Sequence, residues 1–356
     1  MSFAVTKADI NMTFSPGCGC PGMFCRKGNF MIKLSHIRKT FRVARRDAGF
    51  TNAVKSFFVR KYDNIEALSD VSFEINDGEM VGYIGPNGAG KSSTIKVMSG
   101  ILTPDSGECV IDGRTPWLER KAHVANLGVV FGQRSALWWD VPVIDSFELL
   151  RDIYSVPPEE YSKNVQRLTE LLDLGNILRT PTRQLSLGQR MRCEIAAALI
   201  HSPRILFLDE PTIGLDAVSK LAVREFVREL NRERGTTVIL TTPDMQDIEA
   251  LTSRIILIGK GKILLDGELE ALKHRFVGNK TVVAEYSGSL NSLPDGVEIL
   301  DDRSSGNSHR TEFALNDCAV SKLISVLASS VELNDVSVKS ATIDETIVRM
   351  YKEYGI

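Results

Sequence analysis

The chain has 356 residues, of which 43% are hydrophobic and 25% are charged, and its formal net charge at pH 7 is -2. This length allows two domains with sizeable cores, and the nearly balanced charge gives no general attraction to nucleic acid. The apolar runs 205–208 and 255–258 suit buried strands, and no apolar run approaches the ~20 residues of a membrane-spanning helix. We therefore expect any membrane role to depend on another chain that supplies the spans. The first residues also lack the apolar core of a secretory signal.

Residues 1–30 differ in composition from the rest of the chain. They are rich in glycine, proline and cysteine and have neither a helical nor a strand period. Cys18, Cys20 and Cys25 could bind a metal, but a fourth ligand is missing and their spacing does not match a paired C-x-x-C site. We therefore expect a disordered extension in preference to a metal site. The other three cysteines are scattered, which is typical of reduced cytosolic proteins.

An alternation of apolar and polar residues over 31–37 predicts the first strand, and we expect the functional chain to begin there. A basic and aromatic stretch follows over 41–61. One interpretation is contact with anionic lipid or with a membrane subunit. The other, which we favour, is a solvated loop whose aromatic side chains are anchored on the core.

The next elements predict a phosphate-binding loop. A strand over 67–75 ends at an Asp-Gly turn, and a buried strand over 80–84 leads into the loop 85–94, which reads GPNGAGKSST and opens a helix. Its glycines let backbone N–H groups point at phosphate oxygens, and the helix N-terminus adds partial positive charge. Lys91 can then reach the β- and γ-phosphates, while the Ser92 hydroxyl can bind Mg²⁺. The G-x-x-x-x-G-K-S spacing between a strand and a helix predicts a nucleoside triphosphate site rather than a chance glycine-rich turn.

Two adjacent carboxylates follow another buried strand. Asp209 ends the apolar run 205–208, so we expect it at the carboxyl end of a parallel strand, where ligands bind in open α/β sheets. There it can hold Mg²⁺ through water, opposite Ser92. Glu210 points another way and can orient or deprotonate the attacking water, a role typically worth about 10²–10⁴ in rate.

These motifs, with others in between, resemble the nucleotide-binding domain of ATP-binding cassette (ABC) transporters over roughly residues 32–270. After the phosphate loop come, in the family's order, a Q-loop at Gly132-Gln133, a signature sequence at 185–190 (LSLGQR), the Walker B motif at 205–212 (ILFLDEPT) and a D-loop at Gly214-Leu215-Asp216. Leu187 replaces the commoner glycine of the signature, but it keeps the backbone N–H.

The resemblance implies a role for each matching residue. Glu210 and Gln133 are the expected catalytic residues, and Ser92, Gln133 and Asp209 are the expected Mg²⁺ ligands. The expected ATP-binding residues are Tyr62, which would stack on the adenine, and Gly85, Pro86, Asn87, Gly88, Ala89, Gly90, Lys91, Ser92 and Ser93. The residues expected to bind the γ-phosphate held by a second subunit, or to face it, are Ser186, Gly188, Gln189 and Asp216.

The family also implies partners. Two ATP-binding subunits, identical or different, would clamp ATP head to tail, and separate integral membrane subunits would carry the transport. The segment 137–143 contains the adjacent pair Trp138-Trp139. One interpretation is that both belong to the core. An adjacent pair rarely faces one way, so we expect at least one of them at the surface, where it would contact the membrane subunit.

One residue departs from the family pattern. After the strand 237–242 the family usually places a histidine that contacts the γ-phosphate, and this chain has Pro243. Proline offers neither a side-chain donor nor an N–H, yet it suits the first position of a helix over 244–251 with Thr242 as N-cap. We therefore expect the fold to survive and hydrolysis by the chain alone to be slow, since losing one preorganised donor costs other enzymes about 10²–10³ in rate.

We predict an α/β fold of the P-loop NTPase type with a small C-terminal α+β domain. The expected ATPase domain is 31–278, with a helical subdomain at about 134–184, and the expected accessory domain is 279–356, including a last helix over 342–354. The predicted function is the ATP-binding subunit of an exporter-like ABC transporter at the cytoplasmic face of the membrane. The alternative is a hydrolysis-deficient module paired with an active ATPase. A soluble ABC protein of translation or DNA repair is disfavoured by the single cassette without coiled coil or zinc insertion.

Overall fold

The computed structural model describes residues 30–45, 61–132, 134–277, 281–290, 292–315, 318–339 and 343–355. Three expectations concern residues outside these ranges: the extension over 1–29, the middle of the basic aromatic stretch and Gln133.

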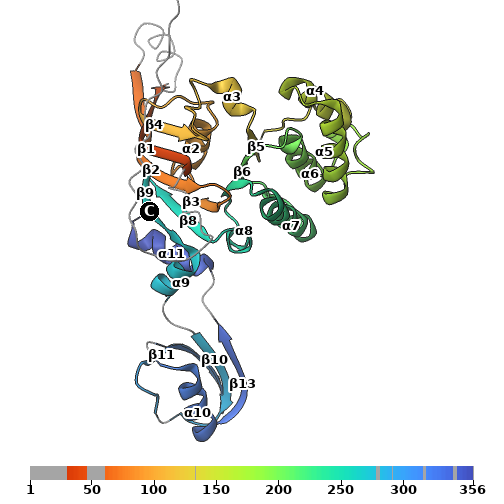
Figure 1. The fold of residues 1–356 in the computed structure, drawn as a ribbon. Coiled ribbons are helices and arrows are strands. Elements are labelled where there is room, and N and C mark those ends of the chain that lie inside the picture. Colours follow the sequence, from red (N-terminus) through yellow and green to blue (C-terminus); the bar gives the residue numbers. More distant parts are fainter. Residues whose placement is uncertain are drawn as a thin grey trace, which may run out of the picture.

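A large mixed sheet forms the body of the protein (Figure 1). Its strands, in order across the sheet, are β4 (Ser106–Ile111), β1 (Phe30–Arg45), β2 (Lys61–Asn76), β9 (Lys262–Glu268), β8 (Arg254–Gly259), β3 (Met80–Ile84), β7 (Thr237–Thr241), β6 (Ile205–Asp209) and β5 (Leu127–Phe131). The strands from β8 to β5 are mutually parallel, whereas β1 pairs antiparallel with β2 and β4. The parallel strands are continuous apolar runs, as expected where both faces of a sheet are covered.

Helices cover this sheet on both faces. They are α2 (Lys91–Met98), α3 (Arg120–Val124), α4 (Val143–Tyr154), α5 (Pro158–Leu171), α6 (Leu187–Leu199), α7 (Ala217–Arg234), α8 (Met245–Leu251) and α9 (Leu269–Val277), with a 3-10 turn at Thr182–Gln184. The helices α4 and α5 both contact α6 and form a group beyond β5 (Figure 1), and α6 packs on β5. A helical subdomain was expected at about 134–184; α4 and α5 lie within this segment, and α6 follows it.

Two apolar cores lie on opposite faces of the sheet. Phe207 of β6 belongs to one core together with Ile95 of α2, whereas its neighbours Leu206 and Leu208 belong to the other, with Ile248 of α8. Successive side chains of a strand point to opposite faces, so this alternation places α2 on one side and α6, α7 and α8 on the other. The phosphate loop, which joins β3 to α2, is therefore held between two packed layers.

A small separate sheet lies below the large one in the view of Figure 1. Its antiparallel strands, in spatial order, are β11 (Val297–Ser305), β12 (Ser308–Leu315), β10 (Thr281–Ser287) and β13 (Glu332–Lys339), and α10 (Val320–Ser330) covers one face. Leu323 and Leu327 of α10 pack into its own core with Val282 and Phe313. The accessory domain expected in this region is thus an α+β unit, as its strand and helix pattern predicted.

The last helix, α11 (Ile343–Glu353), does not belong to that unit. It contacts α8 and α9, and its residues Ile343, Ile347 and Met350 are buried in the core of the ATPase part. The Lys260 Nζ also donates a hydrogen bond to the Gly355 carbonyl at 3.0 Å. The expected boundary therefore needs correction, because the small sheet is inserted between two helices that both pack on the ATPase part.

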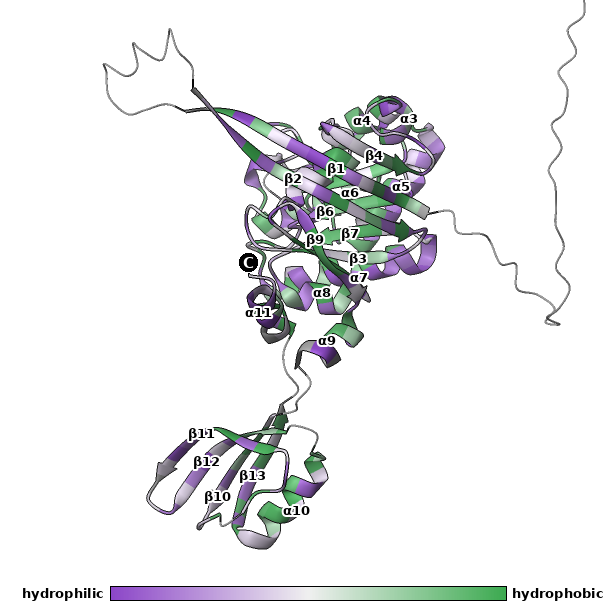
Figure 2. Cartoon of the chain, turned by 90° about the vertical axis from the view of Figure 1, so that its left-hand side faces the viewer, coloured by the Kyte–Doolittle hydropathy of each residue, from purple (hydrophilic) through white to green (hydrophobic). Residues whose placement is uncertain are grey.

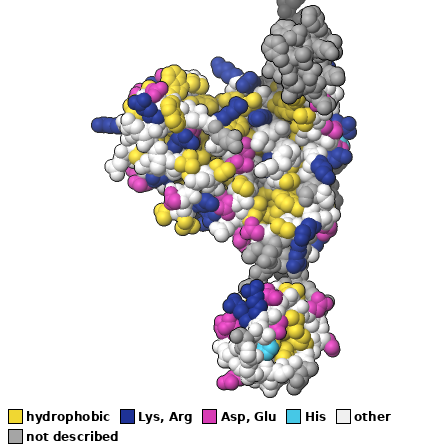
Figure 3. Space-filling view, turned by 180° about the vertical axis from the view of Figure 1, so that it is seen from behind, with side chains coloured by type: hydrophobic (Ala, Val, Ile, Leu, Met, Phe, Trp, Pro, Cys, Tyr) yellow, Lys and Arg dark blue, Asp and Glu magenta, His cyan; other side chains and the backbone are white. Residues whose placement is uncertain are grey.

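The surface gives two further observations. The β1–β2 ribbon extends well beyond the neighbouring strands (Figure 2), and its end leads into residues outside the described ranges. On the face seen from behind, positive and negative side chains are interspersed (Figure 3), in keeping with the small net charge. Among the described helices, none has the length and apolarity needed to cross a membrane.

Candidate functional site

The phosphate loop has a backbone that only glycine permits. Gly90, the residue before α2, has φ +114°, and a Cβ added to it would lie 2.8 Å from the carbonyl oxygen of Ala67. An L-residue would be strained by this φ and would also collide with the backbone of β2. The first turn of α2 contains no acidic residue, so the positive end of the helix is left for an anion.

Lys91 begins α2 and turns back over the loop. Its Nζ donates hydrogen bonds to the carbonyl oxygens of Gly85 at 2.6 Å and Pro86 at 3.2 Å. Partial burial lowers the pKa of the Lys91 ammonium, and the nearby carboxylates of Glu210 and Asp209 partly offset this change. The loop therefore holds a cation at its centre, close to both acidic residues that the sequence singled out.

Ser92, Asp209 and Glu210 line one cavity of about 230 Å³, together with the backbone around Gly132. The Asp209 carboxylate accepts a hydrogen bond from the Thr241 hydroxyl at 2.5 Å. A serine hydroxyl and an aspartate facing a common cavity beside a phosphate loop are the hard oxygen donors that Mg²⁺ prefers. The donor set therefore fits a Mg²⁺–nucleotide, and the pairing expected from the sequence is present. Gln133, the third expected ligand, lies outside the described residues; its sequence neighbours Gly132 and Arg134 both line this cavity.

Glu210 has a strained backbone. Its φ is +57°, a left-handed conformation that is uncommon for a residue with a Cβ. Its N–H donates to the Thr241 carbonyl at 2.8 Å, so the end of β6 is joined to the end of β7. Such strain persists only where the surrounding structure fixes it, and it often occurs at functional sites.

The signature sequence forms a capped helix start. Ser186 is the N-cap of α6, and its hydroxyl accepts a hydrogen bond from the Gln189 N–H at 3.2 Å, while the Gln189 side chain accepts from the Ser186 N–H at 2.9 Å. A Cβ added to Gly188 would lie 2.6 Å from the Ser219 hydroxyl, so the signature and the start of α7 are in close contact. The exposed side chain of Leu187 projects from this turn. None of these residues lines the cavity of Ser92 and Asp209.

Asp216 caps the next helix. Its carboxylate accepts from the Ser219 N–H at 2.9 Å and from the Ser219 hydroxyl at 2.8 Å, and these bonds lower its pKa. The D-loop residue is thus ionised and fixed beside the signature.

Tyr62 lies farther from the loop than the sequence implied. It pairs with Ala44 on the β1–β2 ribbon, and the Arg42 guanidinium lies 5.0 Å from its ring centroid. Ala67, whose carbonyl adjoins Gly90, is five residues along β2, a distance of roughly 17 Å in an extended strand. Phe41 pairs with Ile65, only two residues from Ala67, and is the aromatic residue that the register brings nearer to the loop. The register of β1 against β2 distinguishes Phe41 from Tyr62 as the residue nearer to the loop, and the sequence does not reveal this register.

The region of Pro243 differs in detail from expectation. The helix α8 begins at Met245 and its N-cap is Asp244, not Thr242. Asp244 accepts from the Gln246 N–H at 3.0 Å, and its own N–H donates to the Thr242 hydroxyl at 3.0 Å. Pro243 therefore precedes the helix and is exposed, so its missing N–H removes no helical hydrogen bond.

Glu194 is a residue that the sequence reasoning missed. It lies on α6, and its buried carboxylate accepts hydrogen bonds from the Ser135 hydroxyl and from the Ala136 N–H, the latter at 2.9 Å. Burial raises the pKa of the Glu194 carboxyl, and these hydrogen bonds partly offset the change. The signature helix is thus tied to the segment just after the Q-loop. A lone glutamate on an amphipathic helix gives no signal of this in the sequence.

The pair Trp138-Trp139 lies at the surface, with 60% and 52% of the two residues exposed. The expectation that at least one would be exposed is confirmed. The Arg190 guanidinium lies 5.8 Å from the Trp139 ring centroid. Nearby, a second cavity of about 220 Å³ is formed by α3, β5, α4 and α6. Its lining is largely apolar and includes Val129, Leu150, Tyr154 and Ala197 with Arg120.

Comparison with known proteins agrees with this geometry. The ABC transporter family model matches residues 68–213. The daunorubicin resistance ATP-binding protein DrrA3 of Streptomyces coeruleorubidus is 32% identical over 82% of this chain and 93% of its own length. The ABC transporter ATP-binding protein NatA of Bacillus subtilis is 31% identical over 60% of this chain and 87% of its length.

Among solved structures, the ATP-binding cassette MJ0796, in a dimeric post-hydrolysis state bound to ADP and Pi, matches 67% of this chain and 99% of its own, with 29% identity and a TM-score of 0.57. CbiO1 of Clostridium perfringens, part of the ABC transporter complex cbiONQ, matches 68% of this chain at 25% identity and a TM-score of 0.55. The chain belongs to the ABC transporter family as one of its ATP-binding subunits.

Proposed function

We propose that this chain is the ATPase of an export-type ABC transporter and works at the cytoplasmic face of the membrane with separate membrane subunits. The observation that carries the proposal is the cavity shared by Ser92, Asp209 and Glu210 beside the phosphate loop. It combines an anion-binding helix start, oxygen donors for a divalent cation and a carboxylate that can act as a base.

In this proposal the loop 85–93 binds the phosphates of ATP through its N–H groups and Lys91. Ser92, Asp209 and Gln133 hold Mg²⁺, which neutralises charge on the phosphates when it is bound. The Glu210 carboxylate accepts a proton from the attacking water or orients it for in-line attack. The adenine stacks on an aromatic residue of the β1–β2 ribbon, either Tyr62 or Phe41.

The separation of the signature from this cavity supports a dimer. Ser186, Gly188, Gln189 and Asp216 form a second, contiguous surface that does not line the cavity within one subunit. In a head-to-tail pair, this surface would complete the ATP site of the partner subunit, and closure over ATP would drive the membrane subunits. The dimeric structure of MJ0796 is consistent with such an arrangement.

The exposed tryptophans and the cavity between α3 and α6 support a membrane-subunit interface. Aromatic residues are enriched in such interfaces, and an apolar cavity suits a short helix of a partner. Glu194 accepts a hydrogen bond from the Ala136 N–H, and Arg134, two residues earlier in the chain, lines the ATP cavity.

The direction of transport is inferred from relatives. DrrA3 and the linearmycin resistance ATP-binding protein LnrL of Bacillus subtilis, 28% identical over 92% of its length, are both named for resistance. A methionine import ATP-binding protein also matches, but over only 61% of its length. Whole-length similarity to resistance proteins favours export.

A second candidate rests on Pro243. If the lost histidine contact is not replaced, this chain is a hydrolysis-deficient module that pairs with an active second ATPase. Steady-state ATP hydrolysis by the full chain, compared with Glu210→Gln and Pro243→His, separates the two. Turnover well above that of Glu210→Gln supports the active ATPase. A native rate equal to Glu210→Gln, with recovery in Pro243→His, supports the second candidate.

The partner assignment needs its own measurement. The proposal expects the full chain to be recovered from its native cells together with an integral membrane protein. Recovery only with ribosomes or nucleic acid would overturn it.

A further inference from the structure

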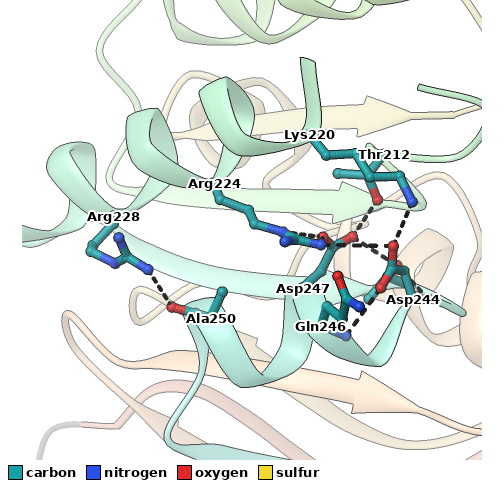
Figure 4. Close-up of polar contacts among 9 residues, drawn as sticks. Thr212, Lys220, Arg224, Arg228, Asp244, Gln246, Asp247 and Ala250 are labelled. Atoms are coloured by element: carbon teal, nitrogen blue, oxygen red, sulfur yellow. Dashed lines mark hydrogen bonds and ion pairs between the residues drawn. The ribbon is translucent and has the colours of Figure 1, made fainter. Parts of the chain in front are cut away.

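A buried carboxylate connects the two loops that carry Glu210 and Pro243. Asp247, in α8, is fully buried, with 0% of its side chain exposed. Its Oδ1 accepts from the Arg224 Nε of α7 at 2.5 Å, and its Oδ2 accepts from the hydroxyls of Thr212 and Thr242, the latter at 3.2 Å. Figure 4 shows Arg224 of α7 and Thr212 directed at the carboxylate of Asp247. The buried charge is thus both paired and hydrogen-bonded, as burial requires.

The two threonines connect Asp247 to the turns of Glu210 and Pro243, although Asp247 itself does not line the cavity of Ser92 and Asp209. Thr212 comes two residues after Glu210, and Thr242 comes immediately before Pro243. The backbone of Glu210 is left-handed; its N–H donates to the Thr241 carbonyl at 2.8 Å, and its own carbonyl accepts from the Ile213 N–H at a long 3.4 Å. The hydrogen bond from the Thr212 hydroxyl to Asp247 adds a side-chain restraint after Glu210. A strained turn needs such restraints to keep its side chain in one direction.

A second ion pair supports the same junction. The Lys220 Nζ of α7 lies 2.5 Å from the Asp244 carboxylate at the start of α8. Together the two pairs hold α7, which follows the D-loop, against α8, which follows Pro243 (Figure 4).

We propose that Asp247, held by Arg224, is a positioning residue that fixes the Glu210 turn to the Pro243 turn and so aims the Glu210 carboxylate at the lytic water. The inference rests on the proposed function only in taking Glu210 as the base. Since a displacement of about 1 Å in a catalytic group can cost 10²-fold in rate, loss of one of these restraints is expected to lower kcat by about 5- to 50-fold. ATP binding by the phosphate loop is left unchanged.

The first test uses Thr212, whose side chain can be changed without altering its volume. Thr212→Val removes the hydroxyl and keeps the shape, whereas Thr212→Ser keeps the hydroxyl. For the full chain we expect Thr212→Val to lower kcat with KM for ATP within twofold, and Thr212→Ser to retain most of the rate. Equal rates for the valine and serine variants, or a loss confined to KM, would overturn the proposal.

The second test separates positioning from general packing of α7 on α8. Arg228 lies one turn after Arg224 on α7 and also bridges to α8, where it donates to the Ala250 carbonyl at 2.9 Å, but it does not contact Asp247 or Thr212 in the described structure (Figure 4). Arg224→Met is expected to lower kcat and Arg228→Met to leave it unchanged, when both are compared at equal folded fraction. An equal loss in both variants would show that helix packing alone matters.

A readout independent of hydrolysis keeps this inference separate from the proposed function. Amide hydrogen exchange of residues 210–215 should be faster in Thr212→Val than in Thr212→Ser, with no change in residues 85–98. If the native chain turns over no faster than Glu210→Gln, the proposed activity fails, and exchange still decides the inference. Unchanged exchange over 210–215 would refute the positioning role whatever the native rate is.

Discussion

The assignment of α11 to the ATPase part predicts an unusual pattern of stability effects. Ile347 is 3% exposed and belongs to the same core as Ile248 of α8, whereas the next residue, Val348, is 50% exposed. Truncating a buried isoleucine to alanine typically costs about 2–5 kcal/mol, from lost transfer free energy and the cavity left behind. We therefore expect Ile347→Ala to remove that much from the ATPase part, and Val348→Ala to change it by less than about 0.5 kcal/mol.

The tryptophans provide a selective probe. All three, Trp117, Trp138 and Trp139, lie in the ATPase part, and the small sheet contains none. Tryptophan fluorescence in urea thus follows the ATPase part alone. With a slope of about 1–3 kcal/mol per molar urea, a loss of about 3 kcal/mol lowers the midpoint by about 1–3 M.

The matched comparison is Leu327→Ala, which opens a cavity in the core of the small sheet. It is expected to leave the tryptophan transition in place. The reasoning would be refuted if Ile347→Ala moved this transition no more than Val348→Ala did. It would be refuted equally if Leu327→Ala moved it as far as Ile347→Ala, because the small sheet and the ATPase part would then unfold together.

Three further predictions concern the site. Gly90→Ala should weaken ATP binding at least about 10-fold, because the added Cβ would collide with the Ala67 carbonyl. Gly113→Ala is the control, since Gly113 also has a positive φ but open space around it, and it should leave ATP binding unchanged. Binding of a fluorescent ATP analogue measures both variants. The pKa of Glu194 is raised in the folded state, so the folded state keeps a proton that the unfolded state releases. The free energy of unfolding should therefore fall as pH rises from the ordinary glutamate range through the raised pKa. Urea unfolding measures this slope, and Glu194→Gln should remove it. Replacing Trp138 and Trp139 by alanine should reduce recovery of the chain in the membrane fraction without changing ATP affinity; unchanged recovery would contradict the interface.

The parts of the site that follow from local patterns could be predicted. The buried strand before Gly85 and the helix after Lys91 define the phosphate loop, and the apolar run before Asp209 places that carboxylate at the end of a parallel strand. Ser92 and Asp209 were expected to lie opposite each other because ligands bind at the carboxyl ends of parallel strands, and both residues line one cavity. Their functional roles stay predictions.

Contacts between distant segments could not be predicted in the same way. The carboxylates of Glu194 and Asp247 accept hydrogen bonds from residues that are distant in the sequence, Ala136 and Thr212 respectively. Nothing in the local sequence pattern around either carboxylate predicts these contacts. Tyr62 shows the same limit. The choice between Tyr62 and Phe41 depends on the register of β1 against β2, and the sequence between these strands, residues 46–60, has no Asn-Gly or Asp-Gly pair from which the register could be counted.

The last helix shows why a domain boundary is harder to predict than its elements. The sequence indicated a helix over 342–354, and α11 is a helix with the buried residues Ile343, Ile347 and Met350 along one face. An apolar face specifies that a helix is buried, but not against which core. Two surfaces were within reach, the small sheet that immediately precedes it and the α8–α9 pair far back in the chain. The small sheet already buries its apolar face under α10, so it had no core left to offer, whereas α8 and α9 leave a face that α11 fills. The small sheet is consequently held by two connections, and the second leads directly to α11, which packs on α8, the helix that carries Asp247.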